Sequence, residues 1–469
     1  MARRYLVLIL AFVAPLLFGG VSTAAELDPS FGVGGASAYA HGGSTQNGWR
    51  VGDNAGQARA LAFDSQNRIL VGGGSGAAML VVRYLPDGEL DQSFGNGGVA
   101  RFFEYQTSGS RSEDPDFVAP RVKSINVASD GRIIVVAQTY AFSSLSGAPR
   151  DAIFWLTDEG ELDTSMGIPF SEKVGDYPNS IPRASAVDRH GNVFIAGQSI
   201  SAIDDFGLPT QYSGYLMKRD PNGEWFEPFG GNRLLGDEIW QGVRVWTPKT
   251  YRQKSAVSSV KLLASGKILV GGHHDNRMFI SRLTAAGKPD RSFGPWQGRK
   301  KSRNKGMSIA DFGGKSCQCV SDAVLGTDQR GRIYLAGTAM YPYKDRIATI
   351  VVVRFLYNGA IDRSFGKNGF ARTVRNPWVR ATSIAIQRNG RIVVAARHGG
   401  DRDSNLMLVR FLNNGKLDKS FFNKGALIQD IGDSSSADQV KIDSKGRIVI
   451  AGGYSSDEKG NFLVERIVP

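Results

Sequence analysis

The chain has 469 residues, of which 41% are hydrophobic, with 58 glycines and only 18 prolines. This composition excludes a disordered or collagen-like chain and is typical of a folded protein rich in turns. The formal net charge is +13 and only two cysteines occur. We therefore expect anionic partners and a fold that does not depend on disulfides.

The first 25 residues have the pattern of an export signal. Arg3 and Arg4 precede a nearly unbroken apolar run from Tyr5 to Phe18, and small residues follow at positions 22–25. Such a segment is too short and wrongly flanked for a stable membrane anchor. We therefore expect a signal peptide over residues 1–25 and an exported protein. No later segment is long and apolar enough to span a membrane, so we expect no membrane span.

Two short motifs recur at intervals of roughly sixty residues, and periods of this size indicate a solenoid, propeller or array. One is a turn followed by an apolar strand, as in Gly131-Arg132-Ile133 and Gly331-Arg332-Ile333. The other is Leu-Asp-x-Ser-Phe-Gly, which is complete from Leu90 to Gly95 and degenerate at Phe229-Gly230. Each motif occurs seven times along the chain, so the repeat is the main structural signal.

Strand patterns come in fours within each repeat. In the first complete unit they cover residues 59–63, 69–72, 79–85 and 98–103, separated by turns rich in Gly and Asp. Four short strands without an amphipathic helix predict one antiparallel meander. That is the composition of a propeller blade.

The two ends of the chain carry complementary parts of one unit. Residues 462–468 match a third strand with no fourth after it, while residues 27–39 carry the motif and a fourth strand alone. Pairing these ends would close a ring and remove its exposed edges. We predict an all-β, seven-bladed β-propeller with four-stranded antiparallel blades, closed by the N-terminal strand. Residues 26–469 would form one domain, with units starting near residues 26, 58, 121, 182, 256, 321, 380 and 437.

The paired motifs, such as Leu90 to Gly95 with Gly131-Arg132-Ile133, resemble the delta-60 repeat family of bacterial β-propeller proteins. The resemblance covers nearly all of the chain after residue 25, although Phe226 stands where the third unit should carry its Asp. It implies the propeller fold and export to the periplasm or exterior of a bacterium. It implies no biochemical activity.

Residues that recur in almost every unit are expected to be structural, because a catalytic site needs one asymmetric cluster. A basic residue precedes the third-strand turn in six units, with Trp155 as the exception: Arg83, Lys218, Arg282, Arg354, Arg410 and Arg466. The motif Asp is kept in six units: Asp28, Asp91, Asp163, Asp290, Asp362 and Asp418. We predict that the Arg binds the Asp within a blade and that the motif Phe plugs the space between neighbouring blades.

Insertions fall on one face of the predicted propeller, in the connections between strands two and three and between blades. A rigid scaffold with variable loops on one face is typical of a binding surface. Aromatic residues on these connections could stack on carbohydrate rings; the alternative is that they pack the loops down. The candidates are Trp240, Trp246, Trp296 and Trp378.

Basic residues also begin the innermost strands and would surround the mouth of the central channel: Arg59, Arg121, Lys123, Arg183 and Arg380. Clustered cations there would favour a small anion or an acidic sugar. The alternative is that they are structural charges bridged by water.

Other chemistry-bearing signals are weak. Cys317 and Cys319 could form a small, strained disulfide after export. His273-His274-Asp275 could contribute to a metal site, but no second cluster at metal-ligand spacing supports it. No phosphate-binding glycine loop, nucleophile elbow or calcium loop occurs, and we expect no cofactor and no metal.

The sequence favours a non-enzymatic binding module that recognises an acidic glycan, a small anion or an envelope protein through its loop-rich face. One alternative is a propeller enzyme, a hydrolase, lyase or dehydrogenase, with its site at the channel mouth; Asp322 and Asp438 are candidate carboxylates. The other is a protein–protein assembly scaffold. We expect a monomer and do not expect nucleic acid as the partner.

Overall fold

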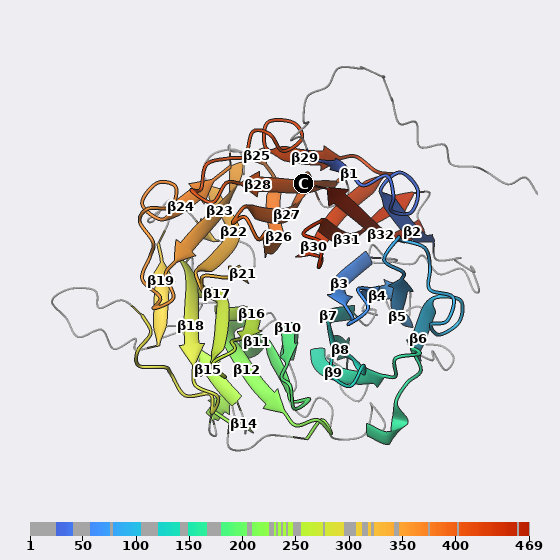
Figure 1. Ribbon diagram of the computed structural model, residues 1–469. Helices are drawn as coiled ribbons and strands as arrows, with labels where there is room; N and C mark the ends of the chain where they lie inside the picture. Colours follow the sequence, from blue (N-terminus) through green and yellow to red (C-terminus); the bar gives the residue numbers. More distant parts are fainter. Residues whose placement is uncertain are drawn as a thin grey trace, which may run out of the picture.

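The structure, a computed structural model, describes these residues: 25–40, 57–75, 78–104, 121–140, 149–166, 180–203, 209–224, 229–230, 233–235, 238–240, 243–246, 255–274, 277–294, 306–311, 318–319, 323–341, 347–373, 376–400, 403–456 and 459–468. Seven antiparallel sheets stand around a central opening, as Figure 1 shows. The protein is a seven-bladed β-propeller, as predicted. Within the described ranges the one helical element is the short 3-10 turn η1 (Thr164–Met166), and no helix could span a membrane.

The blades follow one another along the chain, with the innermost strand first. Blade 1 contains β3 (Gln57–Phe63), β4 (Ile69–Ser75), β5 (Ala78–Tyr84) and β6 (Val99–Glu104). Blade 2 contains β7 (Arg121–Val127), β8 (Ile133–Tyr140) and β9 (Pro149–Leu156). Blade 3 contains β10 (Ser180–Val187), β11 (Val193–Ile203), β12 (Pro209–Arg219) and β15 (Val243–Trp246), with a separate hairpin of β13 (Arg233–Leu235) and β14 (Glu238–Trp240).

The remaining blades complete the ring. Blade 4 contains β16 (Ser255–Leu262), β17 (Ile268–His274), β18 (Arg277–Leu283) and β19 (Met307–Ala310). Blade 5 contains β20 (Gln318–Cys319), β21 (Val324–Thr327), β22 (Ile333–Tyr341), β23 (Ile347–Phe355), β24 (Phe370–Arg372) and β25 (Asn376–Pro377). Blade 6 contains β26 (Val379–Ile386), β27 (Ile392–His398), β28 (Asn405–Phe411) and β29 (Ala426–Gln429). Blade 7 contains β30 (Ser434–Ile442), β31 (Ile448–Ser456) and β32 (Lys459–Val468), completed by β1 (Glu26–Leu27) and β2 (Ala36–Ala40).

The predicted ring closure is confirmed by the register of blade 7. Strand β2 pairs antiparallel with β32, with Ala36 opposite Glu465 and Ala40 opposite Asn461. The Arg466 Nε donates a 2.7 Å hydrogen bond to Asp28 Oδ2, which joins positions 438 residues apart. The outer edge of β32 is therefore paired rather than exposed.

The predicted Arg–Asp pair is confirmed in five blades, at Nε–Oδ2 distances of 2.6–2.8 Å: Arg83–Asp91, Arg282–Asp290, Arg354–Asp362, Arg410–Asp418 and Arg466–Asp28. The same guanidinium lies over the motif Phe, as with Arg354 at 4.6 Å from the ring centre of Phe365. Two units lack the pair. In blade 2 Trp155 takes the place of the Arg, and in blade 3 Lys218 lies over Phe194 instead.

The motif Phe fills the seam between blades, as predicted, and it explains an invariant glycine in the next turn. Phe94 and Phe365 are fully buried. A Cβ on Gly160, which has φ of +88°, would lie 2.6 Å from the Phe94 ring, and one on Gly415 would lie 3.0 Å from the Phe365 ring. Five blades therefore place a glycine turn directly on the motif Phe of the blade before: Gly88, Gly160, Gly287, Gly359 and Gly415.

Glu465 is a buried carboxyl on β32, and it gives a testable pH dependence. Its side chain is 2% exposed, and its Oε2 has no hydrogen-bond partner within the described part of the chain. Burial raises the pKa of Glu465 to about 7, although a hydrogen bond from Gln429 opposes the shift. Folded Glu465 thus keeps its proton to a higher pH than in the unfolded chain.

We expect this group to destabilise the fold by up to about 3 kcal/mol as pH rises from about 4.5 through 7. Glu465→Gln should match the native protein at pH 5 and be the more stable of the two at pH 8, as measured by urea unfolding. Glu89→Gln, at an exposed turn, is the control and should change neither value. A Glu465→Gln protein that gains nothing at pH 8 would contradict the prediction.

Candidate functional site

Each innermost strand carries a local irregularity at the same level of the channel. In blades 1, 2, 3, 4, 6 and 7 the register to the second strand shifts by one residue, as at Ala58/Ala60 and Ala437/Gln439. Such a β-bulge redirects one side chain and often lies beside a functional site. The bulged residues are Arg59, Lys123, Arg183, Ser258, Thr382 and Asp438. They form the central layer of the channel.

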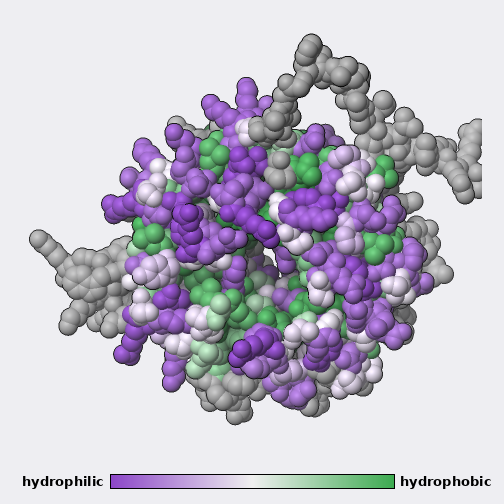
Figure 2. Space-filling model, in the orientation of Figure 1, coloured by the Kyte–Doolittle hydropathy of each residue, from purple (hydrophilic) through white to green (hydrophobic). Residues whose placement is uncertain are grey.

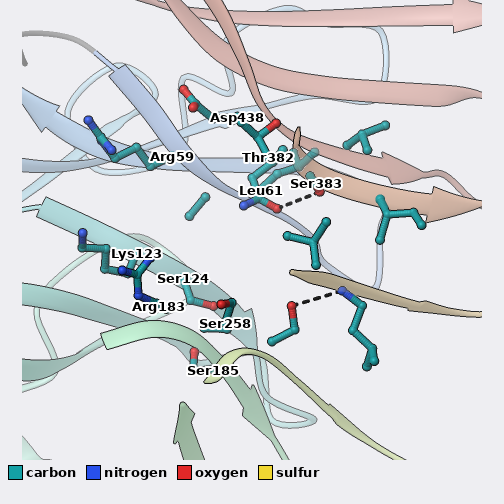
Figure 3. A pocket seen from close by; sticks show the side chains of 18 of the residues that line it. Arg59, Leu61, Lys123, Ser124, Arg183, Ser185, Ser258, Thr382, Ser383 and Asp438 are labelled. Carbon is teal, nitrogen blue, oxygen red and sulfur yellow. Dashed lines mark hydrogen bonds between the residues drawn. The ribbon is translucent and has the colours of Figure 1, made fainter. Parts of the chain in front are cut away.

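These residues line a cavity of about 610 Å³ on the propeller axis. All five of the predicted channel residues lie in its wall: Arg59, Arg121, Lys123, Arg183 and Arg380. In Figure 2 the opening is visible at the centre of the ring, with hydrophilic side chains gathered above it in this view. In Figure 3 Arg59, Lys123 and Arg183 lie on one side of the pocket, with Asp438 near Arg59.

The charge of the wall is strongly asymmetric. Seven basic side chains and one carboxylate occur among its described residues, since Arg397 and Lys441 join the five predicted cations and Asp438 is the acid. A water-filled cavity with this excess of positive charge attracts anions. The neighbouring serines and Thr382 add neutral hydrogen-bonding groups.

Asp438 is the centre of a network that no other blade repeats among the residues the structure describes. Arg397, from β27 of blade 6, donates from Nη2 to Asp438 Oδ1 at 2.7 Å. Ser436 Oγ donates to the other carboxylate oxygen at 2.9 Å. Arg397 also reaches Gln57 of blade 1 at 3.2 Å, and Gln57 accepts a 2.6 Å hydrogen bond from Arg59. The network thus fixes two guanidinium groups across the seam of blades 6, 7 and 1.

These contacts set the charge states of the cluster. Burial raises the pKa of Asp438, but Arg397 and Arg59 beside it lower the pKa by more, so the net shift is downward. Asp438 is therefore ionised at neutral pH. Burial lowers the pKa of Arg59 to about 10; Asp438 opposes this shift, and repulsion from nearby arginines adds to it. Arg59 remains a cation at neutral pH.

Two other channel arginines face the cavity differently. Arg183 Nη2 donates to Gln198 Oε1 at 3.0 Å, so a residue of the second strand orients it, as Arg397 orients Asp438. The Nε of Arg121 is buried and has no hydrogen-bond partner among the residues the structure describes. A buried donor of this kind is satisfied most readily by a ligand oxygen or by water.

Of the predicted tryptophans, Trp378 is the one whose side chain is described, and it is not part of the cavity wall. Trp378, 43% exposed, precedes β26, while Trp240 and Trp246 end strands β14 and β15. Trp296 lies outside the described residues, as do Cys317 and Asp322. Cys319 lies in β20. His273 and His274 end β17, and no group of three or more potential metal ligands occurs in the described ranges.

The sequence analysis missed Arg397, Gln57 and Lys441. Arg397 lies on a second strand, where neither repeated motif marks it, although blade 1 has the small residue Gly74 opposite the same position of its inner strand. No repeated residue type marks this position, which in other blades carries Gly74, Gln138, Gln198, His273 and Gly453.

A family model described as a β-propeller domain of unknown function, DUF5122, matches residues 67–94 and 263–293. The chain therefore carries repeats of a β-propeller family. No curated protein matches it in sequence.

Solved structures resemble the chain in fold. An ulvan lyase of polysaccharide lyase family PL25, bound to the saccharide GlcA(1-4)Rha3S, gives a TM-score of 0.51 at 10% identity over 88% of this chain and 94% of that chain. The polysaccharide lyase Uly1 gives 0.48 at 10% identity, over 92% and 93%. The soluble aldose sugar dehydrogenase from Escherichia coli gives 0.37 at 12% identity, over 92% and 99%. At sequence identities this low, the similarity shows a shared fold and nothing about activity.

These comparisons correct one expectation. The sequence favoured a non-enzymatic binding module, whereas the solved propeller with a TM-score of 0.51 to this chain is named as an ulvan lyase. That preference for a non-enzyme was wrong, and the enzyme alternative fits the findings better. The physical reason for the error is that Asp438 could be identified only as a candidate, since Arg397 and Gln57, which complete the network around it, come from blades 6 and 1.

Proposed function

We propose that the chain is a propeller enzyme that acts on an anionic saccharide in the central cavity. The observation that carries the proposal is the set of seven cations around a single carboxylate held by Arg397 and Ser436. Repeated structural ions would be paired within each blade, as the motif Arg and Asp are. The channel cations instead face one shared space from different blades, which suits a ligand with several oxygens.

The reaction class that suits this charge distribution is β-elimination from a uronic acid. Asp438, the carboxylate among the described residues of the wall, accepts the C5 proton and can return it to the leaving oxygen. Negative charge then develops on the carboxylate of the sugar, and cations aimed at that group stabilise it. Arg59 and Arg121 can supply this stabilisation, and ionised Asp438 holds Arg397 and Arg59 in place. The C4–O bond then breaks, the electron pair forms the C4–C5 double bond, and the leaving oxygen takes up a proton.

The ulvan lyase of similar fold is bound to a glucuronate-containing saccharide, which makes glucuronate polymers the first substrates to test. The full chain would be incubated with polymers of glucuronate, polymers of galacturonate and a neutral glucan. We expect ultraviolet absorbance of the new double bond with a uronate polymer and none with the glucan. If no anionic polymer is cleaved, by this absorbance or by new reducing ends, the proposal fails.

The proposed binding is electrostatic and should respond to salt. Raising sodium chloride from about 0.05 to 0.5 M shortens the screening length several-fold and should lower kcat/KM about tenfold, mainly through KM. Initial rates at several substrate concentrations would measure this. A KM that does not change with salt would contradict binding by the cationic wall.

The proposal also covers the localisation, domain organisation and partner of the enzyme. We expect an exported bacterial protein of the delta-60 repeat type, with residues 26–469 as one domain that acts as a monomer. An acidic glycan would be its partner. The N-terminal segment expected to direct export lies outside the described residues.

A further inference from the structure

Two lysines lie beyond the Asp438 layer of the channel. Lys441 of β30 lies three residues after Asp438, and Lys261 of β16 lies three residues after Ser258. The two strands stand across the central opening from each other (Figure 1). Since a strand rises about 3.3 Å per residue, the lysines are about 10 Å further along the channel than the bulged residues.

The repeat does not require lysine at this place. The corresponding residues of the other five innermost strands are uncharged: Ala62, Asn126, Ala186, Gly326 and Ala385. Lysine is therefore confined to two blades on opposite sides of the channel. A scaffold of repeated blades does not need a residue that occurs in only two of them. A ligand site is asymmetric and does need such residues.

Neither lysine has a counter-charge in the described part of the chain. Lys441 is part of the cavity wall, and Asp438, the acidic residue of that wall, is already bound by Arg397 and Ser436. Burial lowers the pKa of Lys441 to about 8, and repulsion from Lys261 adds to the shift. Burial lowers the pKa of Lys261 as well. Lys441 is half-buried and Lys261 is exposed. Two ammonium groups that repel each other are relieved by an anion between them.

We infer that Lys261 and Lys441 form a second anion site, which binds an oxyanion group such as a sulfate. The arginine layer and this lysine site would then hold two anionic groups of one ligand, about 10 Å apart along the axis. The inference deepens the proposed function, since it specifies a saccharide with two acidic groups, but anion binding at the lysines does not depend on catalysis.

The test is protection of individual lysines from acetylation. The full chain would react briefly with acetic anhydride at pH 8, with sodium sulfate or with sodium chloride at equal ionic strength, and mass spectrometry would give the rate at each lysine. We expect sulfate to slow acetylation of Lys441 and Lys261 at least about fivefold, because a bound anion raises their pKa and covers them. Lys416, exposed in a turn of blade 6, is the internal control and should not change.

Two results would overturn the inference. One is equal protection of Lys416, and the other is protection of Lys123 without protection of Lys441, which would place the anion at the arginine layer alone. A variant gives an independent check. In Lys261→Met, loss of repulsion should slow acetylation of Lys441 without sulfate and remove the effect of sulfate; Lys416→Met should behave like the native protein.

The outcome separates the inference from the proposed function. Sulfate protection in a protein that cleaves no uronate polymer would support the lysine site and reject the enzyme. Cleavage without protection would support the enzyme and reject the lysine site. If both hold, Lys261→Met should raise KM for a sulfated uronate polymer and leave KM for its desulfated form unchanged.

Discussion

Replacing Arg354 by alanine should lower the free energy of unfolding by about 3–5 kcal/mol, the usual cost of removing one partner of a buried ion pair. Arg354 is 4% exposed and donates from Nε to Asp362 at 2.8 Å. Its other nitrogens reach Ser364 at 3.0 Å and the carbonyl of Asn413, in the next blade, at 2.5 Å. The substitution would leave Asp362 without its cation and the Asn413 carbonyl without its donor.

Urea unfolding followed by tryptophan fluorescence would measure the loss. Arg363→Ala is the matched control, because Arg363 is the exposed neighbour of Asp362 and its removal should cost less than about 0.5 kcal/mol. Equal stability of the two variants would show that the repeated pair does not hold the blades together.

The second large effect concerns the proposed reaction. Arg59→Met should lower kcat/KM on a uronate polymer by about 10²–10³-fold, as removal of one donor to a developing oxyanion usually does. Arg59 is the suitable position because Asp438 keeps its bond to Arg397 when Arg59 is lost. The cluster therefore stays assembled while one cation is removed from the cavity.

Arg363→Met, on the outer part of blade 5, changes the net charge equally and serves as the control. It should retain native kcat/KM, and both variants should unfold at nearly the native urea concentration. A loss of activity of the same size in both variants would indicate a general effect of charge. Full activity in Arg59→Met would show that Arg59 does not take part in the reaction.

The fold was predictable because its determinants are local and repeated. The turn recurs in every blade, and the basic residue and the motif Asp each recur in six, so the pair Arg354–Asp362 follows from their constant spacing. Closure was predictable too, since residues 36–40 supply the strand that residues 459–468 lack. The hairpin β13–β14 and the split inner strand of blade 5 were not predictable, because both arise in irregular segments.

The site was predictable only in part. Channel cations such as Arg59 and Arg183 were identified because they begin innermost strands. The network around Asp438 was not, because Arg397 and Gln57 come from blades 6 and 1, and their meeting depends on the ring being closed. No local sequence pattern predicts which side chains of neighbouring blades contact each other.

The pairing of β2 with β32 also determines which part of the protein can fold last. The strand that completes blade 7 is synthesised first and its partner last, so Asp28 must remain unpaired while the other blades are made. Contacts of such long sequence separation form late and slowly. The bond between Arg397 and Gln57 spans 340 residues and crosses the same seam. The cavity therefore acquires its assembled form only in the last step of folding, so that an incomplete chain, however many blades it has folded, carries no finished site.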